Sequence, residues 1–195
     1  MQAPSKRGRP QEADPRHVAR VALHLFEQRG FDRVTMGEIA AAASVSRRTL
    51  FRLFPSKLDL VWDGLKDVRD AVKPRAASLA GAGLPLGAVI DELFVPVLRS
   101  LDEPATADMA RRRLRLIAGA PALLHHEAFQ EIEALVATAV AAGALPRGAP
   151  PSLVARTLVG AVFAALLWWA EHGEGMSALE AARAALKTLA LADRA

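Results

Sequence analysis

The chain has 195 residues, a formal net charge of +4 and no cysteine. This length suits one domain of ordinary size or a small module joined to a larger one. Disulfides, thiolate nucleophiles and zinc–thiolate sites are excluded, and an N-terminal stretch without an apolar signal core leads us to expect a cytoplasmic protein.

The positive charge is concentrated in the front part of the chain. Residues 1–57 contain 11 Lys or Arg against 5 Asp or Glu, whereas residues 58–195 contain 14 against 16. Such asymmetry indicates that the front part meets a polyanion. Within it, Lys6, Arg7 and Arg9 are expected to form a flexible basic arm, which can add salt-dependent affinity or enter a minor groove.

Helical periodicity and frequent Ala, Leu and Arg predict an all-α chain of about nine helices. The first helix follows Pro15, carries apolar residues at helical spacing and closes at Gly30. Thr35 and Glu38 form a capping-box pattern at the start of a second helix, which runs to about Ala43.

The third and fourth predicted helices lie on either side of a proline. Ser46 caps the third, which must end just before Pro55 because proline disfavours helical geometry in the preceding residue. Ser56, with Asp59 three residues on, caps a longer fourth helix over residues 57–79. Loops rich in Gly and Pro then separate five more helices, near residues 87–101, 105–118, 122–142, 152–171 and 177–192.

The second and third helices form a helix-turn-helix, in which the later helix enters the major groove with its first residues facing base edges. Arg47 and Arg48 occupy this leading turn, where an arginine can donate two hydrogen bonds to guanine. Thr49 can contact a thymine methyl group. We therefore expect these three residues to read bases.

Other residues of this segment are expected to contact the DNA backbone. Ser46 and Lys57 begin helices, where free amides and an ammonium group can hold a phosphate, and Arg52 has a similar role. A short arginine-rich helix is also typical of a solvated face, but the capped two-helix spacing favours DNA. Phe54 is expected in the core, and Phe51 either in the core or against the DNA backbone.

The stretch TMGEIAAAASVSRRTLFRLFPSKLDLVWDGL, residues 35–65, resembles the DNA-binding region of TetR-family transcriptional regulators. The match extends back through ALHLFEQRGFDRVT, from residue 22. The resemblance implies DNA-backbone contacts by Thr35 and Lys57. The family commonly has glycine where Ser44 stands, and tyrosine where Phe51 stands, so Phe51 lacks the hydroxyl that often contacts a phosphate.

RRTLFRLFPSKLDLVW, with RRRLRLIAGAPAL at residues 111–123, is also similar to regulators associated with mycofactocin systems, which are thought to sense acyl-coenzyme A. The chain is expected to divide into a flexible basic arm at residues 1–14, a helix-turn-helix DNA-binding domain at 15–60 and a rear domain at 61–195. The family resemblance implies that the rear domain binds a ligand and forms the dimer. It further implies a homodimeric repressor that a small hydrophobic or acyl-type effector releases from a palindromic operator.

The last two long helices carry small and apolar residues at helical spacing, which favours close packing against other helices. The family places the dimer interface on these two helices. The residues expected there are Leu153, Thr157, Gly160, Ala164, Leu167, Leu179, Ala182 and Leu186.

Apolar residues of the rear helices are expected near an effector pocket, although ordinary core packing explains each of them equally well. These are Phe94, Leu98, Leu116, Phe129, Phe163 and Trp168. Arg112 and Arg115 could pair with an anionic ligand, because guanidinium groups match phosphate geometry, but a solvated helix face is favoured for this charge run.

Three other classes of function have weaker support. The run GAGLPLG at residues 81–87 lacks the Rossmann glycine spacing, and no serine has a nucleophile-elbow context, so neither an enzyme nor a cofactor is expected. Adjacent His125 and His126 point about 100° apart on a helix, so no metal site is expected. The apolar run at residues 158–170 is shorter than the roughly 20 residues of a membrane span, so a buried core or interface helix is expected there.

The alternative to a regulator is a helical interaction or ligand-binding module whose basic front end binds DNA non-specifically.

Overall fold

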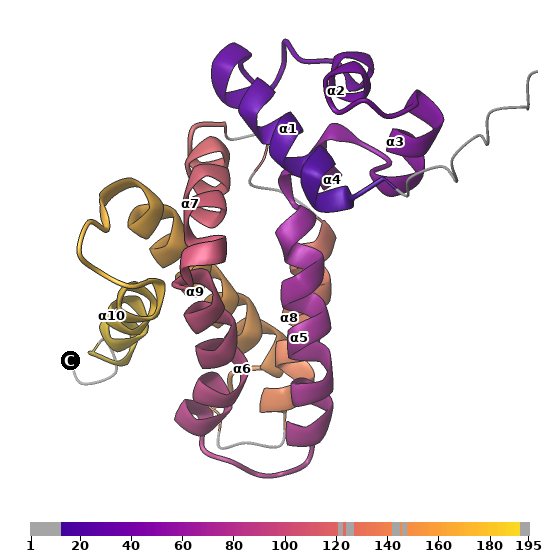
Figure 1. Cartoon of the computed structure of the whole chain (residues 1–195). Coiled ribbons are helices and arrows are strands. Elements are labelled where there is room, and N and C mark those ends of the chain that lie inside the picture. Colours follow the sequence, from indigo (N-terminus) through magenta and orange to yellow (C-terminus); the bar gives the residue numbers. More distant parts are fainter. Residues whose placement is uncertain (1–12, 121–122, 124–126, 142–144, 146–147, 192–195) are drawn as a thin grey trace, which may run out of the picture. The chain divides into compact units, whose positions relative to one another are not determined.

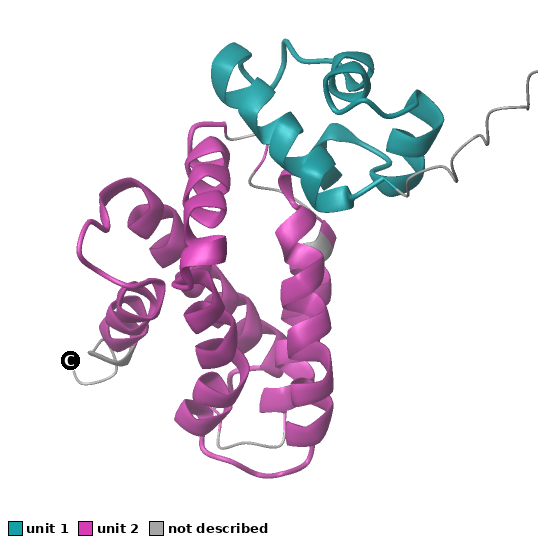
Figure 2. Cartoon of the chain, in the orientation of Figure 1, with its two compact units in different colours: residues 1–60 teal, residues 61–195 magenta. Residues whose placement is uncertain are grey.

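The computed structural model describes residues 13–120, 123, 127–141, 145 and 148–191. Within these ranges the chain forms ten α-helices and no strand, which confirms the predicted all-α class. It divides into two compact units, residues 1–60 and 61–195 (Figure 2). The predicted basic arm at Lys6, Arg7 and Arg9, and the pair His125 and His126, lie outside the described residues.

The first unit is a small bundle of short helices (Figure 1). Its buried side chains include Phe26 in the first helix, Ile39 in the second and Leu50 in the third. The first helix ends, as predicted, at Gly30, whose φ of 83° suits a residue without a β-carbon. The helices are α1 (Pro15–Arg29), α2 (Met36–Ala42), α3 (Arg47–Leu53) and α4 (Lys57–Val61).

The three caps predicted within this unit are confirmed. Thr35 and Glu38 form a complete capping box at the start of α2. The Ser46 hydroxyl accepts a 3.0 Å hydrogen bond from the amide of residue 49 at the start of α3. At α4 the Ser56 amide donates to the Asp59 carboxylate at 2.7 Å. Each cap satisfies an amide that the helix itself leaves free.

The second unit contains six longer helices, and α8 packs against both α5 and α9. Their larger apolar cluster includes Val72, Leu93 and Val136, and a smaller one surrounds Trp169. The helices are α5 (Asp63–Leu79), α6 (Leu86–Leu101), α7 (Pro104–Ala118), α8 (Glu127–Val140), α9 (Pro151–His172) and α10 (Ala178–Leu191).

The prediction of a single helix over residues 57–79 is wrong, because the helix is interrupted at Trp62 and the segment forms α4 and α5 instead. The Trp62 indole nitrogen donates a 3.1 Å hydrogen bond to the Leu123 carbonyl oxygen, and its ring packs 5.0 Å from that of Phe129. These partners are more than 60 residues away in sequence, so helical periodicity could not indicate the break. The helix predicted to begin near residue 122 is described only from Glu127.

The helix α9 has 22 residues and a mean hydropathy of 1.8, so it is long and apolar enough to cross a membrane. In this fold it is instead packed against α7, α8 and α10. It buries eight residues, among them Leu158, Val162 and Trp169. Leu153 and Trp168 remain about half exposed, at 54% and 48%. The structure therefore makes α9 a core helix that leaves part of its apolar surface uncovered.

Candidate DNA-binding site and effector region

The helix α3 buries one face and exposes a basic one. Arg47, Arg48 and Arg52 are exposed, whereas Leu50 is fully buried. The two phenylalanines differ, because Phe54 is 4% exposed and Phe51 is 49% exposed. Phe54 therefore lies in the core, as predicted, and Phe51 stands with the arginines on the outer surface.

The Arg47 side chain returns from α3 towards the first turn of α2. Its Nη2 atom lies 2.7 Å from the position that a β-carbon on Gly37 would occupy. Only a glycine at residue 37 therefore leaves room for the guanidinium group in this position. Sequence reasoning missed this contact, although a glycine inside a helix often marks a close approach.

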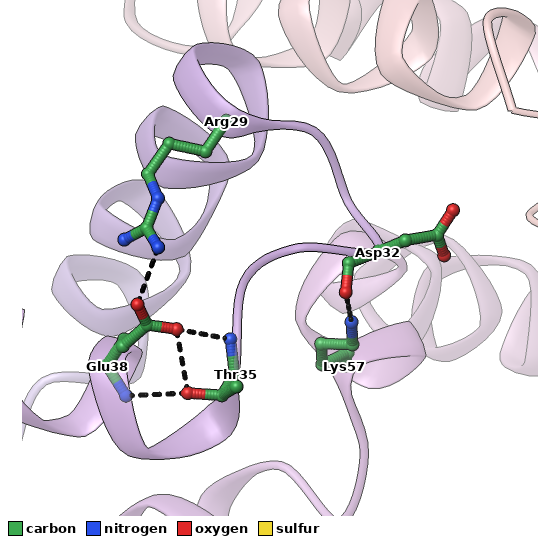
Figure 3. A network of polar contacts seen from close by, with 5 residues as sticks. All are labelled: Arg29, Asp32, Thr35, Glu38 and Lys57. Atoms are coloured by element: carbon green, nitrogen blue, oxygen red, sulfur yellow. Dashed lines mark hydrogen bonds and ion pairs between the residues drawn. The ribbon is translucent and has the colours of Figure 1, made fainter.

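A polar network fixes the start of α2 (Figure 3). The Thr35 amide and hydroxyl both donate 2.8 Å hydrogen bonds to the Glu38 carboxylate, and the Glu38 amide donates back to the hydroxyl at 3.2 Å. Arg29 forms a 2.6 Å ion pair with the other carboxylate oxygen. The Thr35 amide, followed by Arg29, lowers the pKa of Glu38 from 4.5 to about 2.

Lys57 contacts the loop between α1 and α2. Its ammonium group donates to the carbonyl oxygens of Phe31 and Asp32, at 2.8 and 3.4 Å, and lies 4.5 Å from the centroid of the Phe31 ring. Figure 3 shows the bond to Asp32. An ammonium group has three donors, so these two bonds leave one for another acceptor. The contact with a phosphate predicted for Lys57 stays a prediction, and the structure adds a bridging role.

The turn of the helix-turn-helix contains a residue in the left-handed region. Ser44 has a φ of 57°, a conformation that costs a residue with a side chain about 1–3 kcal/mol. The turn is held by hydrogen bonds from the Ser44 amide to the Ala41 carbonyl, at 3.1 Å, and from the Val45 amide to the Ala40 carbonyl, at 3.0 Å. This geometry explains why glycine suits the position.

Two more residues predicted to contact DNA contact each other. The Ser46 and Thr49 hydroxyl groups are 2.8 Å apart, so one donates to the other at the start of α3. This pair orders the turn that carries Arg47 and Arg48. The predicted base contact of Thr49 and backbone contact of Ser46 would use the remaining hydrogen-bonding capacity of each hydroxyl.

In the second unit, three aromatic side chains form a cluster. The rings of Phe129 and Phe163 are 4.6 Å apart, and Trp62 packs against both, at 5.0 and 5.7 Å. The sequence did not indicate that Trp62 belongs to this cluster, because nothing in its local sequence distinguishes it from another helical core residue. Trp168 is not part of the cluster, since it stacks 5.7 Å from His172 on the surface.

The other residues expected near a pocket lie in the core or at its edge. Phe94 and Leu98 are buried in the larger apolar cluster, against which Phe129 packs, and Leu116 is half-buried. Arg112 pairs with Asp108 at 3.5 Å. The Arg115 Nε atom donates a 2.6 Å hydrogen bond to the carbonyl oxygen of Ala170. Both arginines thus have partners within the chain.

The residues expected in a dimer interface differ in exposure. Four of them line the exposed side of α9: Leu153, Thr157, Gly160 and Ala164. Leu167 is half-buried on the same helix. On α10, Leu179 and Leu186 are half-buried against the larger apolar cluster, and Ala182 is fully buried inside it. The Ala182 side chain therefore has no surface left for a partner.

Comparisons with known proteins agree with this arrangement. The model of bacterial regulatory proteins of the tetR family matches residues 19–62, and a tetracyclin repressor-like C-terminal domain matches residues 116–192. A proposed mycofactocin biosynthesis transcriptional regulator, MftR, from Mycobacterium tuberculosis is 31% identical over 202 residues, which cover 93% of this chain and 91% of that protein.

Solved structures share the fold. The repressor SmeT of the Stenotrophomonas maltophilia multidrug efflux pump SmeDEF has a TM-score of 0.62 at 20% identity, covering 92% of this chain and 90% of that one. Thermus thermophilus FadR, a TetR-family repressor in complex with lauroyl-CoA, has a TM-score of 0.58 at 24% identity, covering 90% and 93%. The chain belongs to the tetR family of bacterial regulatory proteins, which are DNA-binding transcriptional regulators with a helical ligand-binding domain.

Proposed function

We propose that this regulator is a homodimeric repressor that binds a palindromic operator through α3 and leaves it when a small hydrophobic or acyl-type effector binds. The observation that carries the proposal is the row of exposed Arg47, Arg48, Phe51 and Arg52 on a helix whose start and end are both defined. Such a helix fits the major groove and presents guanidinium groups to base edges. A cytoplasmic location follows from the DNA partner.

The DNA contacts divide into two kinds. Arg47, Arg48 and Thr49 read bases, because they occupy the leading turn of α3. The remaining predicted residues contact the sugar–phosphate backbone and position α3 without reading sequence. This group consists of Thr35, Ser46, Phe51, Arg52 and Lys57. Phe51 has no hydroxyl group, so it makes an apolar contact with the backbone.

The dimer would form through the uncovered side of α9 and the adjacent part of α10. Leu153, Thr157, Gly160 and Ala164 lie three or four residues apart, so they share one side of the helix. Small residues at two of these positions permit a partner helix to approach closely. A second copy would cover the apolar surface that α9 leaves exposed, and a two-fold axis would place two α3 helices on a palindrome.

The effector would act within the second unit, residues 61–195. A hydrophobic or acyl-type molecule suits the cluster of Trp62, Phe129 and Phe163, and Thermus thermophilus FadR, which shares the fold, is described in complex with lauroyl-CoA. The effector changes DNA affinity only if it prefers one arrangement of the dimer, and couplings of about 1–3 kcal/mol are typical.

The first experiment measures binding of the purified protein to its own upstream intergenic DNA by fluorescence anisotropy, with scrambled DNA as control, at two salt concentrations. We expect at least about a hundredfold preference for the upstream DNA. Arg48→Ala should reduce this preference while leaving binding to scrambled DNA nearly unchanged. Equal, weak and steeply salt-dependent binding to both DNAs would favour the alternative, a helical interaction or ligand-binding module with a non-specific basic front end.

A further inference from the structure

Four arginines lie within five residues on α7, and the structure separates their roles. Arg112 and Arg115 have the partners described above. Arg111 donates to backbone carbonyl oxygens beyond the end of α9, at 3.2 and 3.4 Å, and its guanidinium carbon lies 4.1 Å from the centroid of the Trp169 ring. Arg111 and Arg115 therefore connect α7 to the end of α9 and the loop after it, whereas the Arg112–Asp108 pair lies within α7. The fourth, Arg113, is in a different situation.

Arg113 is a mostly buried cation whose hydrogen bonding is incomplete. Its side chain is 16% exposed, and the Asp63 carboxylate lies 3.8 Å away, beyond normal hydrogen-bond distance. Its Nε atom is fully buried and, within the described part of the chain, has no acceptor. Burial lowers the pKa of Arg113, and the carboxylates of Asp63 and Asp67 oppose this effect. A buried donor without an acceptor costs stability, so the arrangement calls for a functional reason.

The backbone of α5 is shaped to receive this guanidinium group. The Arg113 Nη1 atom lies 2.6 Å from the position of a β-carbon on Gly64, so any larger residue there would displace it. Gly64 is the second residue of α5, a helix whose N-cap residue, Trp62, supplies no side-chain cap hydrogen bond. Amides in the first turn of a helix favour an anion, as the guanidinium group does.

The carboxylate partner of Arg113 adjoins an aromatic residue in the chain. Trp62 immediately precedes Asp63 in the chain, and its ring belongs to the aromatic cluster with Phe129 and Phe163. A cation that has unused hydrogen-bonding capacity, and whose contacts Asp63 and Gly64 directly follow Trp62, matches a ligand that has an oxyanion at one end and an apolar body. Guanidinium groups recognise carboxylates and phosphates through two parallel hydrogen bonds.

We propose that Arg113 is the residue that recognises the oxyanion of the effector, a carboxylate or phosphate attached to an apolar body that packs on the cluster of Trp62, Phe129 and Phe163. This inference rests on the proposed effector-controlled function and moves the anion contact from Arg112 and Arg115 to Arg113. The effector oxyanion competes with Asp63 for the guanidinium group. Binding thereby changes the contacts of the first turn of α5.

The test compares three ligands with the same alkyl chain: decanoate, decyl phosphate and decanol. Their affinities for the full-length protein are measured by isothermal titration calorimetry below the micelle concentration of each. We expect wild-type protein to bind at least one of the two anions about tenfold more tightly than decanol. A preference for decanoate identifies a carboxylate effector, and a preference for decyl phosphate identifies a phosphate effector.

Variants then assign the preference to one side chain. Arg113→Gln should abolish it, and Arg112→Gln, which removes the same charge one residue away, should preserve it. Gly64→Ala changes no charge but displaces the guanidinium group, so it should reduce the preference severalfold. If circular dichroism shows that Arg113→Gln does not fold, Gly64→Ala and Arg113→Lys take its place in the test. Arg113→Lys should also reduce the anion preference, since lysine keeps the charge and loses the paired hydrogen bonds.

Three outcomes would overturn the inference: no saturable binding of any alkyl ligand, equal affinities for the three in wild-type protein, or an anion preference that survives in Gly64→Ala and in the folded Arg113 variants. Operator binding is measured separately on each variant without ligand. A failure of the proposed repressor function therefore appears in the DNA titration, whereas a failure of the Arg113 inference appears in the ligand titration.

Discussion

The Lys57 ammonium group donates a 2.8 Å hydrogen bond to the carbonyl oxygen of Phe31, a residue 26 positions earlier in the chain. With its second bond, to Asp32, this lysine connects the start of α4 to the loop between α1 and α2. A residue that the family resemblance assigns to DNA therefore also stabilises the helix-turn-helix unit. A DNA-binding defect in a Lys57 variant would have two sources, which the first prediction separates.

Lys57→Met should lower the free energy of unfolding by about 1–3 kcal/mol, because it removes hydrogen bonds from a charged donor to two carbonyl oxygens while keeping an apolar stem. Urea denaturation monitored by circular dichroism measures the change. Lys66→Met, which removes the same charge from an exposed lysine on α5, serves as the control. If the two variants unfold alike, the Lys57 bonds contribute nothing to stability and its role is confined to DNA.

Ser44→Gly should raise the free energy of unfolding by about 1 kcal/mol, because glycine adopts a φ of 57° without the strain that a β-carbon causes. The gain is smaller than the full strain, since glycine also increases the entropy of the unfolded chain. Thermal unfolding of Ser44→Gly and of Ala42→Gly, an exposed helical position in α2, tests this. The Ala42 variant should lose stability; a loss in both would show that Ser44 is not strained.

Gly37→Ala should weaken specific operator binding about tenfold, because its β-carbon would occupy the position of the Arg47 guanidinium group, and one arginine–guanine pair contributes about 1–3 kcal/mol of discrimination. The thermal stability should not fall, since only the flexible end of Arg47 has to move and alanine favours a helix. Fluorescence anisotropy compares it with Gly87→Ala, where a β-carbon meets no atom within 4 Å. Unchanged operator affinity would mean that the position of Arg47 beside Gly37 does not contribute to operator binding.

Glu38→Gln should flatten the pH dependence of stability in acid. The pKa of Glu38 is about 2 in the folded chain, against 4.5 as the ordinary value. A carboxylate with a lowered pKa stabilises the fold above pH 4.5 and loses this contribution as the pH falls towards 2. Melting temperatures across this range should therefore fall less in Glu38→Gln than in wild-type protein.

Arg29→Met provides a graded comparison for Glu38. The Thr35 amide is the largest cause of the lowered pKa and Arg29 is the next, so this variant should keep part of the acid dependence. Identical pH profiles in wild-type protein and Glu38→Gln would show that the capping box does not contribute to acid unfolding.

Ala164→Glu should convert the proposed dimer into a monomer, because it places a charge at the centre of the exposed side of α9. Sedimentation velocity measures the change in mass, and operator affinity should fall with it. Ala105→Glu, at an exposed position in the first turn of α7, introduces the same charge elsewhere and should leave the dimer intact. A dimer that persists in Ala164→Glu would require an interface away from this side of α9.

The sequence by itself determined where several helices begin and end. Thr35 with Glu38, Ser46, and Ser56 with Asp59 were recognisable as caps, because each cap joins groups only three residues apart. The motif around α2 and α3 also indicated the family, and the asymmetric charge indicated a polyanionic partner. These properties depend on local hydrogen bonds or on composition, and both can be read along the chain.

Only the tertiary structure decided what the individual side chains contact. The break at Trp62, the return of Arg47 to Gly37 and the bridge from Lys57 to the α1–α2 loop all depend on partners outside their own helices. The arginines of α7 look equivalent in sequence, yet the structure directs Arg113 to the start of α5, 50 residues earlier. Helical periodicity specifies which side of a helix is buried; which distant group meets that side depends on how the helices pack.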